Sequence, residues 1–204
     1  MEPQRTSVPR QHEPALSGAL SGGWAFRLQL GSPGGPSASP KVGAFREKDR
    51  FEKELLDAEN VSSTILRPAI FMETLDIMIQ GPVAFVPGRQ RWPVSLIAAR
   101  DIARAAVRAI QRDILGRYEL AGPETVTFDE AFHRLGKARE KKIRTLHVPL
   151  VTLHAAGRFS PYVREMAHMM ALFDEVGFAT DTSALRDTFD VPTLTIEEWA
   201  HEER

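Results

Sequence analysis

Apolar residues recur with helical spacing in a strongly charged stretch between Phe45 and Asp57. At about 100° per residue, the apolar side chains share one side of this helix and most of the charged ones lie opposite. Lys48 and Glu52 are exceptions, because the spacing places both of them in the middle of the apolar stripe. An unpaired buried charge is strongly destabilising, so these two side chains must be paired, reach solvent, or line a polar pocket. The apolar stripe consists of Phe45, Phe51, Leu55 and Leu56.

Lys48 and Glu52 can be interpreted in two ways. In the first, they form an i,i+4 ion pair at the edge of the core, which contributes only about 0.2–0.5 kcal/mol. In the second, Lys48 faces a ligand cleft. The next segment, residues 61–66, is a β-branched strand of the buried parallel type, which Arg67 and Pro68 are expected to end. Because open α/β sheets bind ligands at the carboxyl ends of such strands, this order favours the second interpretation.

The rest of the chain alternates between strand and helix patterns. Short stretches of alternating or β-branched apolar residues predict strands, and longer stretches with helical spacing predict helices. The glycines and prolines of GPVAFVPG, residues 81–88, predict a turn-rich connection. The expected strands are 24–30, 61–66, 92–97, 117–120 and 143–148, and the expected helices include 70–79 and 102–112.

Several of the expected helices carry recognisable end signals. An oxygen-bearing side chain just before a helix can accept a hydrogen bond from a free backbone N–H group, and a glutamate three residues later completes a capping box. The signals are Asp101 before helix 102–112, the boxes Thr127 with Glu130 and Thr195 with Glu198, and Ser160 with Pro161 followed by a stop at Gly177. Helix 102–112 is expected to turn Ile102, Ala106, Ala109 and Ile110 inward, the methionines after Ser160 belong in the core, and the last helix should bury Trp199.

The order of these elements predicts the fold class. Strands and helices alternate through the middle of the chain, which is typical of an α/β fold, and the mostly helical end predicts an appended cap. Residues 1–23 lack apolar periodicity and are expected to be disordered. A chain of 204 residues with 43% hydrophobic content can bury one core. We therefore expect one folded domain, residues 24–204.

Composition excludes several functional classes. The net charge is −1, with 26 Lys and Arg against 27 Asp and Glu and no basic run, so neither nucleic acid nor an anionic membrane is an expected partner. The absence of cysteine excludes disulfides, thiol nucleophiles and thiolate metal sites. The histidines lack metal-ligand spacing, and neither a GxSxG elbow nor a Walker loop is present. Without a membrane-length apolar run or a signal peptide, we expect a cytoplasmic protein that binds no metal.

Four motifs in a fixed order carry a family resemblance. They are KxxxE at 48–52, TILRPAIFME at 64–73, PVSLIAARDIARAA at 93–106 and GRYELAGPETVTFDEAF at 116–132. Together they resemble the carboxyl-terminal two thirds of the atypical short-chain dehydrogenase/reductases, and most of all the NmrA-like NAD(P)-binding proteins. The resemblance implies a Rossmann fold, with helices on both faces of a parallel sheet, and NAD(P)H as the cofactor. It implies either a reductase of the quinone or isoflavone type or a redox-sensing regulator without turnover.

The resemblance also implies roles for single residues. Ser32 would lie near the position of the family's active-site serine. Lys48 would hydrogen-bond the nicotinamide ribose, which makes it the candidate catalytic residue. The backbone of Pro68, Ile70 and Phe71 would lie against the nicotinamide ring.

The sequence departs from the family pattern in two ways. The family begins with a strand and a GxxGxxG turn, whose backbone N–H groups hold the pyrophosphate of the cofactor. This sequence has no such segment, since the glycines at 18, 22 and 23 follow no apolar strand. We therefore expect the first βαβαβ half to be absent and the sheet to be incomplete. The family's tyrosine, four residues before the lysine, is replaced by Ala44, which removes the usual proton donor.

Two hypotheses about function follow. In the first, the chain is an NAD(P)-binding oxidoreductase-type protein that acts on a small molecule and holds the dinucleotide without the glycine loop or with the help of a separate chain. In the second, it is a non-catalytic, truncated Rossmann-like domain that acts as a binding or regulatory module on a protein partner or a second copy of itself. The retained motifs favour the first hypothesis, and the missing glycine loop favours the second. The sequence identifies neither the substrate nor a preference for NAD or NADP.

Overall fold

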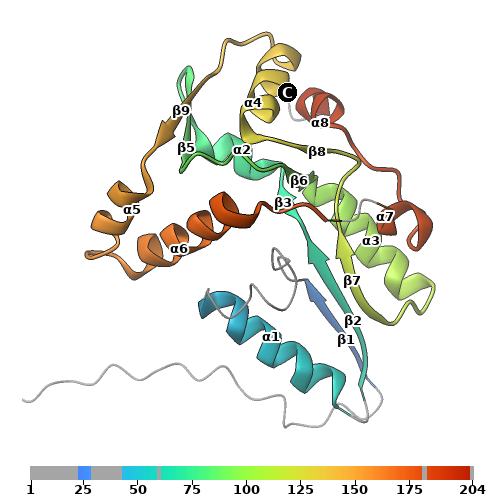
Figure 1. Ribbon diagram of the computed structural model, residues 1–204. Helices are drawn as coiled ribbons and strands as arrows, with labels where there is room; N and C mark the ends of the chain where they lie inside the picture. The colour runs from blue at the N-terminus through green and yellow to red at the C-terminus, as the bar shows by residue number, and fades with distance from the viewer. Residues whose placement is uncertain (1–22, 29–42, 59–60, 181–182, 203–204) are drawn as a thin grey trace, which may run out of the picture.

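The computed structural model describes residues 23–28, 43–58, 61–180 and 183–202. Its main sheet has three parallel strands in the order β1-β2-β7. Helix α1 (Gly43–Leu56) joins the first two strands, and because these are parallel, the helix runs antiparallel to both (Figure 1). The strands are β1 (Gly23–Leu28), β2 (Val61–Pro68) and β7 (Gly116–Leu120).

Helices cover both faces of this sheet. Helix α1 lies on one face and α3 (Ala99–Gln111) on the other (Figure 1). The hydroxyl group of Thr64 in β2 donates a 2.6 Å hydrogen bond to the carbonyl of Ile114, just after α3, whereas Arg67 turns towards α1. Because β2 is covered on both faces, residues 63–68 are all buried and the strand shows no alternation of exposure.

The chain changes partner strands directly after β2. The backbone N–H of Ala69 donates to the carbonyl of Leu120 at 2.7 Å, and β3 then pairs in parallel with β6. Gly122 donates from its backbone N–H to the carbonyl of Leu96 at 2.8 Å. A Cβ atom at Gly122 would lie 2.4 Å from that carbonyl oxygen, so only glycine allows the chain after β7 to approach β6 this closely.

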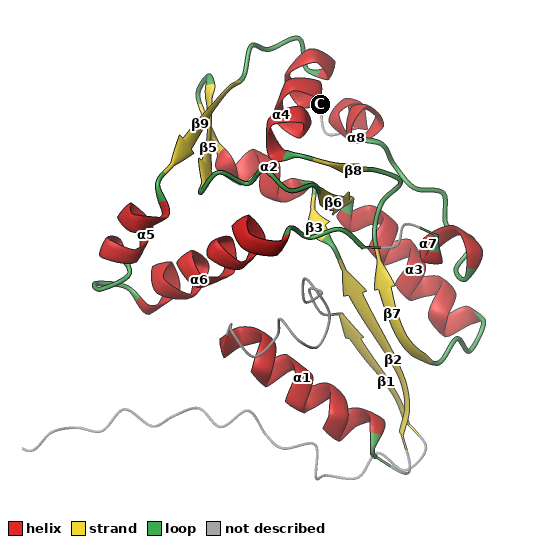
Figure 2. Cartoon of the chain, in the orientation of Figure 1, coloured by secondary structure: helices red, strands yellow, loops and turns green. Residues whose placement is uncertain are grey.

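The remaining elements complete a fold whose carboxyl-terminal part is mostly helical (Figure 2). Strand β6 pairs antiparallel with β8, and β5 pairs antiparallel with β4 and parallel with β9. The elements are β3 (Ile70–Phe71), α2 (Glu73–Met78), β4 (Ile79–Gln80), β5 (Val83–Pro87), β6 (Val94–Ile97), β8 (Thr125–Val126), α4 (Phe128–Ala138), β9 (Arg144–Val148), α5 (Leu150–Ala156), α6 (Pro161–Val176), α7 (Ala184–Asp187) and α8 (Ile196–Glu202). The predicted fold class is confirmed: an incomplete Rossmann-like parallel sheet has helices on both faces and a helical carboxyl-terminal cap.

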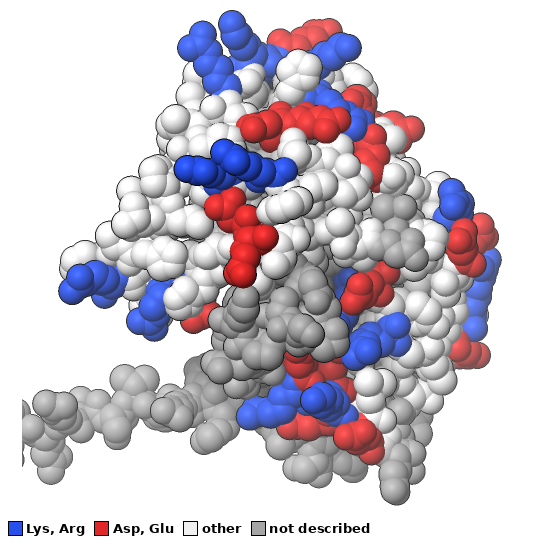
Figure 3. All heavy atoms as spheres, in the orientation of Figure 1, with Lys and Arg blue, Asp and Glu red and all other residues white. Residues whose placement is uncertain are grey.

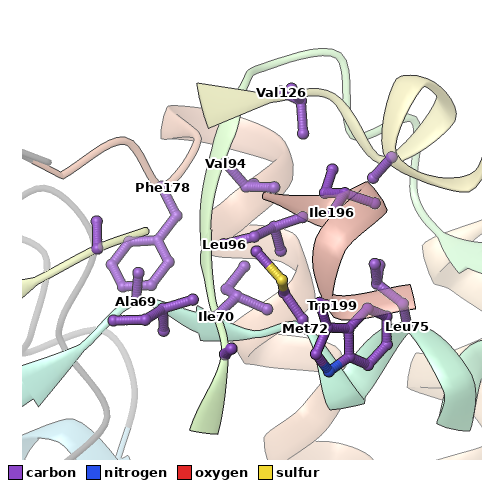
Figure 4. Close-up of a cluster of buried hydrophobic side chains, with 14 of the residues drawn as sticks. Ala69, Ile70, Met72, Leu75, Val94, Leu96, Val126, Phe178, Ile196 and Trp199 are labelled. Carbon is purple, nitrogen blue, oxygen red and sulfur yellow. The ribbon is translucent and has the colours of Figure 1, made fainter. Parts of the chain in front are cut away.

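The core lies where β3, β6 and β8 meet α2 and α8. Figure 4 shows Met72, Leu75 and Leu96 packed with Ile196 and Trp199 of the last helix. Trp199 is buried as predicted. The methionines of α6 also contribute to this core, since Met170 is buried and Met166 and Met169 are partly buried against it.

The end signals confirmed by the structure are all local. Thr127 accepts a hydrogen bond from the backbone N–H of Glu130, and Ser160 caps α6 in the same way. Thr195 and Glu198 form both bonds of a capping box, because each side chain accepts from the backbone N–H of the other residue. Gly177 ends α6 with a φ of 73°.

Other predictions are corrected by long-range pairing. Arg67 and Pro68 do not end β2, because β7 lies beside them and pairs with them through Glu119 and Leu120. The helix expected at 70–79 begins only at Glu73, since the first two residues pair with β6 and the last belongs to β4. The turn-rich connection expected at 81–88 contains β5, which pairs with β9 more than fifty residues later in the chain.

Asp101 is not an N-cap. Helix α3 begins two residues earlier, at Ala99, and its N-cap residue Ala98 has no side chain that can cap. Glu73 instead accepts a hydrogen bond from the backbone N–H of Ala99 at 3.1 Å. The buried face of α3 also differs from the predicted one, because Ile110 is exposed and Ala105 is buried.

Some predictions fall outside the described residues. This group includes the site residue Ser32, the expected strand end at Leu30 and the expected disorder of residues 1–22. Gly23, which was also expected to be disordered, is instead the first residue of β1. Among the helices that the structure describes, none has the length and apolar character needed to cross a membrane. On the face seen in Figure 3, basic and acidic side chains are interspersed over the described surface.

Candidate functional site

An ion-pair network joins α1 to the carboxyl end of β2. The guanidinium group of Arg67 donates from Nε to Glu52 Oε1 at 3.0 Å and from a terminal nitrogen to Glu52 Oε2 at 2.6 Å. The same terminal nitrogen donates to Asp49 Oδ1 at 3.0 Å. Two parallel bonds between a guanidinium and a carboxylate fix direction as well as distance. Helix α1 is therefore held against the last residues of the strand.

This network is buried. The side chains of Arg67 and Glu52 are 5% and 1% exposed. Glu119 lies 3.9 Å from Arg67, and Arg117 lies 3.9 Å from Glu52, and both come from the neighbouring strand β7. Burial alone would lower the pKa of Arg67, but the hydrogen bond and charge of Glu52, with the charges of Asp49 and Glu119, more than offset it and raise the pKa. Arg67 is thus a fixed cation.

Two of the predicted site segments have neighbouring residues in contact at this edge. Lys48 is half-buried and precedes Asp49, while Pro68 follows Arg67, so the Asp49–Arg67 contact brings the two predicted segments side by side. Pro68 is buried, Ile70 is 5% exposed, and Phe71 is half-buried. Ser32 belongs to a part of the chain that is not described.

Sequence reasoning missed Arg67 as a member of the site. A pair with Lys48, one turn away, was one of the two interpretations of Glu52, and neither of them included the bidentate bond that Glu52 accepts from Arg67 on the adjacent strand. A signal was available, because Arg67 follows a strand of the buried parallel type and Glu52 lies within an apolar stripe. Two charges of opposite sign in buried positions of neighbouring elements are expected to pair.

The two tyrosines of the chain, Tyr118 and Tyr162, lie on β7 and α6. Tyr118 of β7 donates its hydroxyl group to the carbonyl of Leu115 at 2.9 Å, and its ring packs edge-on against Phe189. Tyr162 is exposed on α6. The residues that the structure describes also contain no group of three His, Asp or Glu side chains placed to hold a metal ion.

The edge of β2 carries residues whose chemistry can be compared with that of a dinucleotide. A lysine ammonium group and buried apolar backbone at Pro68 and Ile70 suit a ribose and a flat nicotinamide ring. Arg67 is unsuited to bind a phosphate, because its guanidinium is already paired with Glu52 and Asp49. Lys48, Pro68 and Ile70 are thus the residues of this edge that could hold a nicotinamide ribose, and the sequence lacks the glycine-rich turn that would hold the pyrophosphate.

Known proteins resemble this chain in structure. Comparison with protein-family profiles gives no match, and comparison with curated protein sequences gives none either. The NADPH-dependent quinone oxidoreductase of Escherichia coli, solved with NADPH, has a TM-score of 0.71 at 21% identity over 88% of this chain and 65% of its own.

Two further solved structures have the same fold. A nucleoside-diphosphate-sugar epimerase from Staphylococcus aureus gives a TM-score of 0.67 at 17% identity, over 87% of this chain and 64% of its own. The triphenylmethane reductase of Citrobacter sp., solved with NADP(H), gives 0.65 at 14% identity, over 88% and 65%. The chain thus spans about two thirds of the length of each of these proteins.

Proposed function

We propose that this chain forms the nicotinamide side of an NAD(P)H-binding, NmrA-like oxidoreductase-type protein that acts on a small molecule. Lys48 hydrogen-bonds the nicotinamide ribose, and the backbone at Pro68, Ile70 and Phe71 lies against the nicotinamide. The observation that supports the proposal is the contact between Asp49, the residue after Lys48, and Arg67 near the carboxyl end of a buried parallel strand.

The chemistry of this edge supports the assignment. The cofactor, when bound, supplies a hydride to the substrate. Lys48 contributes a positive charge and three N–H donors at the ribose, where hydroxyl groups can accept them. The buried residues Pro68 and Ile70 exclude water from one side of the ring.

A second candidate is a non-catalytic binding or regulatory module. Two observations favour it: the sequence has no strand followed by GxxGxxG, and Ala44 stands where the family has its tyrosine. The Tyr118 hydroxyl group is already bonded to a backbone carbonyl and does not replace that tyrosine. If the first proposal holds, the phosphates of the cofactor must be bound by residues outside a glycine-rich turn, for example by residues of a partner chain.

Thermal-shift titration with NADPH and NADH tests the proposal. A ligand that binds only the folded protein adds about 2.7 kcal/mol to its stability at about 100 times the dissociation constant, which is seen as a raised melting temperature. We expect a shift in the wild type, none in Lys48→Met, and a wild-type shift in Lys53→Met, whose side chain is exposed on the same helix. A cooperative transition without any shift would favour the non-catalytic module, and a retained shift in Lys48→Met would exclude the role of Lys48.

A further inference from the structure

Glu52 is buried in α1, whereas Glu54, two residues later, is exposed. The side chain of Glu52 is 1% exposed and that of Glu54 is 65% exposed. Glu52 receives three hydrogen bonds from the Nε and a terminal nitrogen of Arg67, and Asp49 receives a fourth. The network thus contacts α1 at Asp49 and Glu52, which are three residues apart and lie on the same face of the helix.

We infer that the Glu52–Arg67 pair is a positioning device, which fixes the rotation of α1 about its axis and so holds Lys48 at the carboxyl end of β2. This inference rests on the proposed function for the role of Lys48, and on the ion-pair geometry for the device itself.

The directional character of the pair is the physical reason. Apolar contacts such as those of Leu55 are not directional, so they allow a helix to rotate or slide on a sheet. A guanidinium fork bound to a carboxylate allows one orientation, and an ammonium group in its place would act as a point charge. The cost of leaving either charge unpaired in a buried site further disfavours any rotation that separates them.

Helix geometry then places Lys48. It precedes Glu52 by four residues, which is one turn on the same face and about 6 Å along the axis. Because α1 runs antiparallel to β2, that displacement points beyond Arg67 towards Pro68 and the end of the strand (Figure 1). Any rotation of α1 that moved Glu52 away from Arg67 would turn Lys48 away from this edge as well.

The first test needs no cofactor. Lysines of the purified full chain are acetylated under limiting reagent, and the acetylation of Lys48 is compared with that of exposed Lys53 by mass spectrometry. We expect Glu52→Gln to raise the Lys48 to Lys53 ratio several-fold, and Glu54→Gln, the same change on the exposed face, to leave it unchanged. Asp101→Ala serves as a further control, because it weakens the fold at α3 without contacting α1.

A second variant covers the case in which Glu52→Gln does not fold. Arg67→Lys keeps the charge and loses the fork, and we expect it to raise the same ratio. If either folded variant leaves the ratio at the wild-type value, the inference is wrong. A ratio that rises equally in Asp101→Ala would also overturn it, since the effect would then reflect general loss of stability.

The second test measures NADPH affinity. We expect Glu52→Gln to weaken NADPH binding by about tenfold or more, which is at least about 1.4 kcal/mol, and Glu54→Gln to leave it unchanged. Unchanged affinity in a variant with raised Lys48 acetylation would show that the pair does not position a binding lysine. If the wild type itself binds no NADPH, the proposed function fails, and the acetylation ratio alone decides whether the pair orients α1.

Discussion

The carboxylate of Asp101 in α3 accepts a 2.8 Å hydrogen bond from the backbone N–H of Leu194, a residue 93 positions later in the chain. The Asp101 side chain is completely buried and also lies 3.5 Å from Arg104. This hydrogen bond joins the segment before α8 to α3. The Asp101 carboxylate thus links the carboxyl-terminal cap to a helix that covers the Rossmann-like sheet.

Replacing Asp101 is expected to destabilise this connection. Asp101→Ala leaves the partly buried N–H of Leu194 without its acceptor, and we expect it to lower the free energy of unfolding by about 1–3 kcal/mol. Asp101→Asn retains a carbonyl oxygen that can accept the same bond, so its loss should be smaller. Urea denaturation of the two variants measures the difference, and equal losses would mean that the Leu194 bond contributes nothing.

The same carboxylate predicts a pH dependence of stability. Burial raises the pKa of Asp101, and the hydrogen bond from Leu194 and the charge of Arg104 only partly oppose this effect. The folded state therefore binds the proton more tightly than the unfolded state does. The resulting stabilisation is complete below the unfolded pKa of about 3.9 and is lost as the pH rises through the raised folded pKa.

The wild type should thus gain stability relative to Asp101→Asn as the pH is lowered from about 7 to about 4. Denaturation midpoints of both proteins across this range check the prediction. Because the other carboxylates are common to both proteins, their titration cancels in the comparison. A constant difference between the two would show that Asp101 has the same pKa in the folded and unfolded states.

The buried ion pair predicts strong non-additivity. Arg67→Met leaves the Glu52 carboxylate buried without its guanidinium, and we expect a loss of about 3–5 kcal/mol in the free energy of unfolding. The double variant Glu52→Leu with Arg67→Met removes both charges and should recover most of this loss, because well-packed apolar residues can replace a buried pair. A double variant that is less stable than Arg67→Met would argue against this account.

The capping box at the start of α8 predicts a smaller effect. Thr195→Ala removes the acceptor for the Glu198 backbone N–H, and we expect a loss of about 1 kcal/mol. Thr193→Ala, two residues earlier and partly exposed, is the matched control and should change stability by less than about 0.5 kcal/mol. Thermal unfolding monitored by circular dichroism separates the two, and similar losses in both variants would exclude a specific capping effect.

Part of the candidate site could be predicted from the sequence. The resemblance to the NmrA-like proteins implied that Lys48 holds the nicotinamide ribose and that Pro68 lies against the nicotinamide, and the carboxyl end of strand 61–66 was the expected ligand-binding edge of an α/β sheet. Their neighbours Asp49 and Arg67 are indeed bonded. The pairing of Glu52 with Arg67, 15 residues away in sequence, could not be read from helical spacing, which relates Glu52 only to residues of its own helix. Spacing along one helix carries no information about which strand lies beneath it.

The sequence by itself determined the features that depend on residues within about one helical turn of each other. The capping bonds of Thr127 and Thr195, the glycine stop at Gly177 and the strand-helix alternation belong to this class. Only the tertiary structure decided that β3 and β5 are strands and that Asp101 faces Leu194 rather than its own helix end. Those outcomes depend on backbone and polar groups that come from remote parts of the chain. A buried N–H group or carboxylate pairs with whichever partner the packing brings near, and local sequence does not specify that partner.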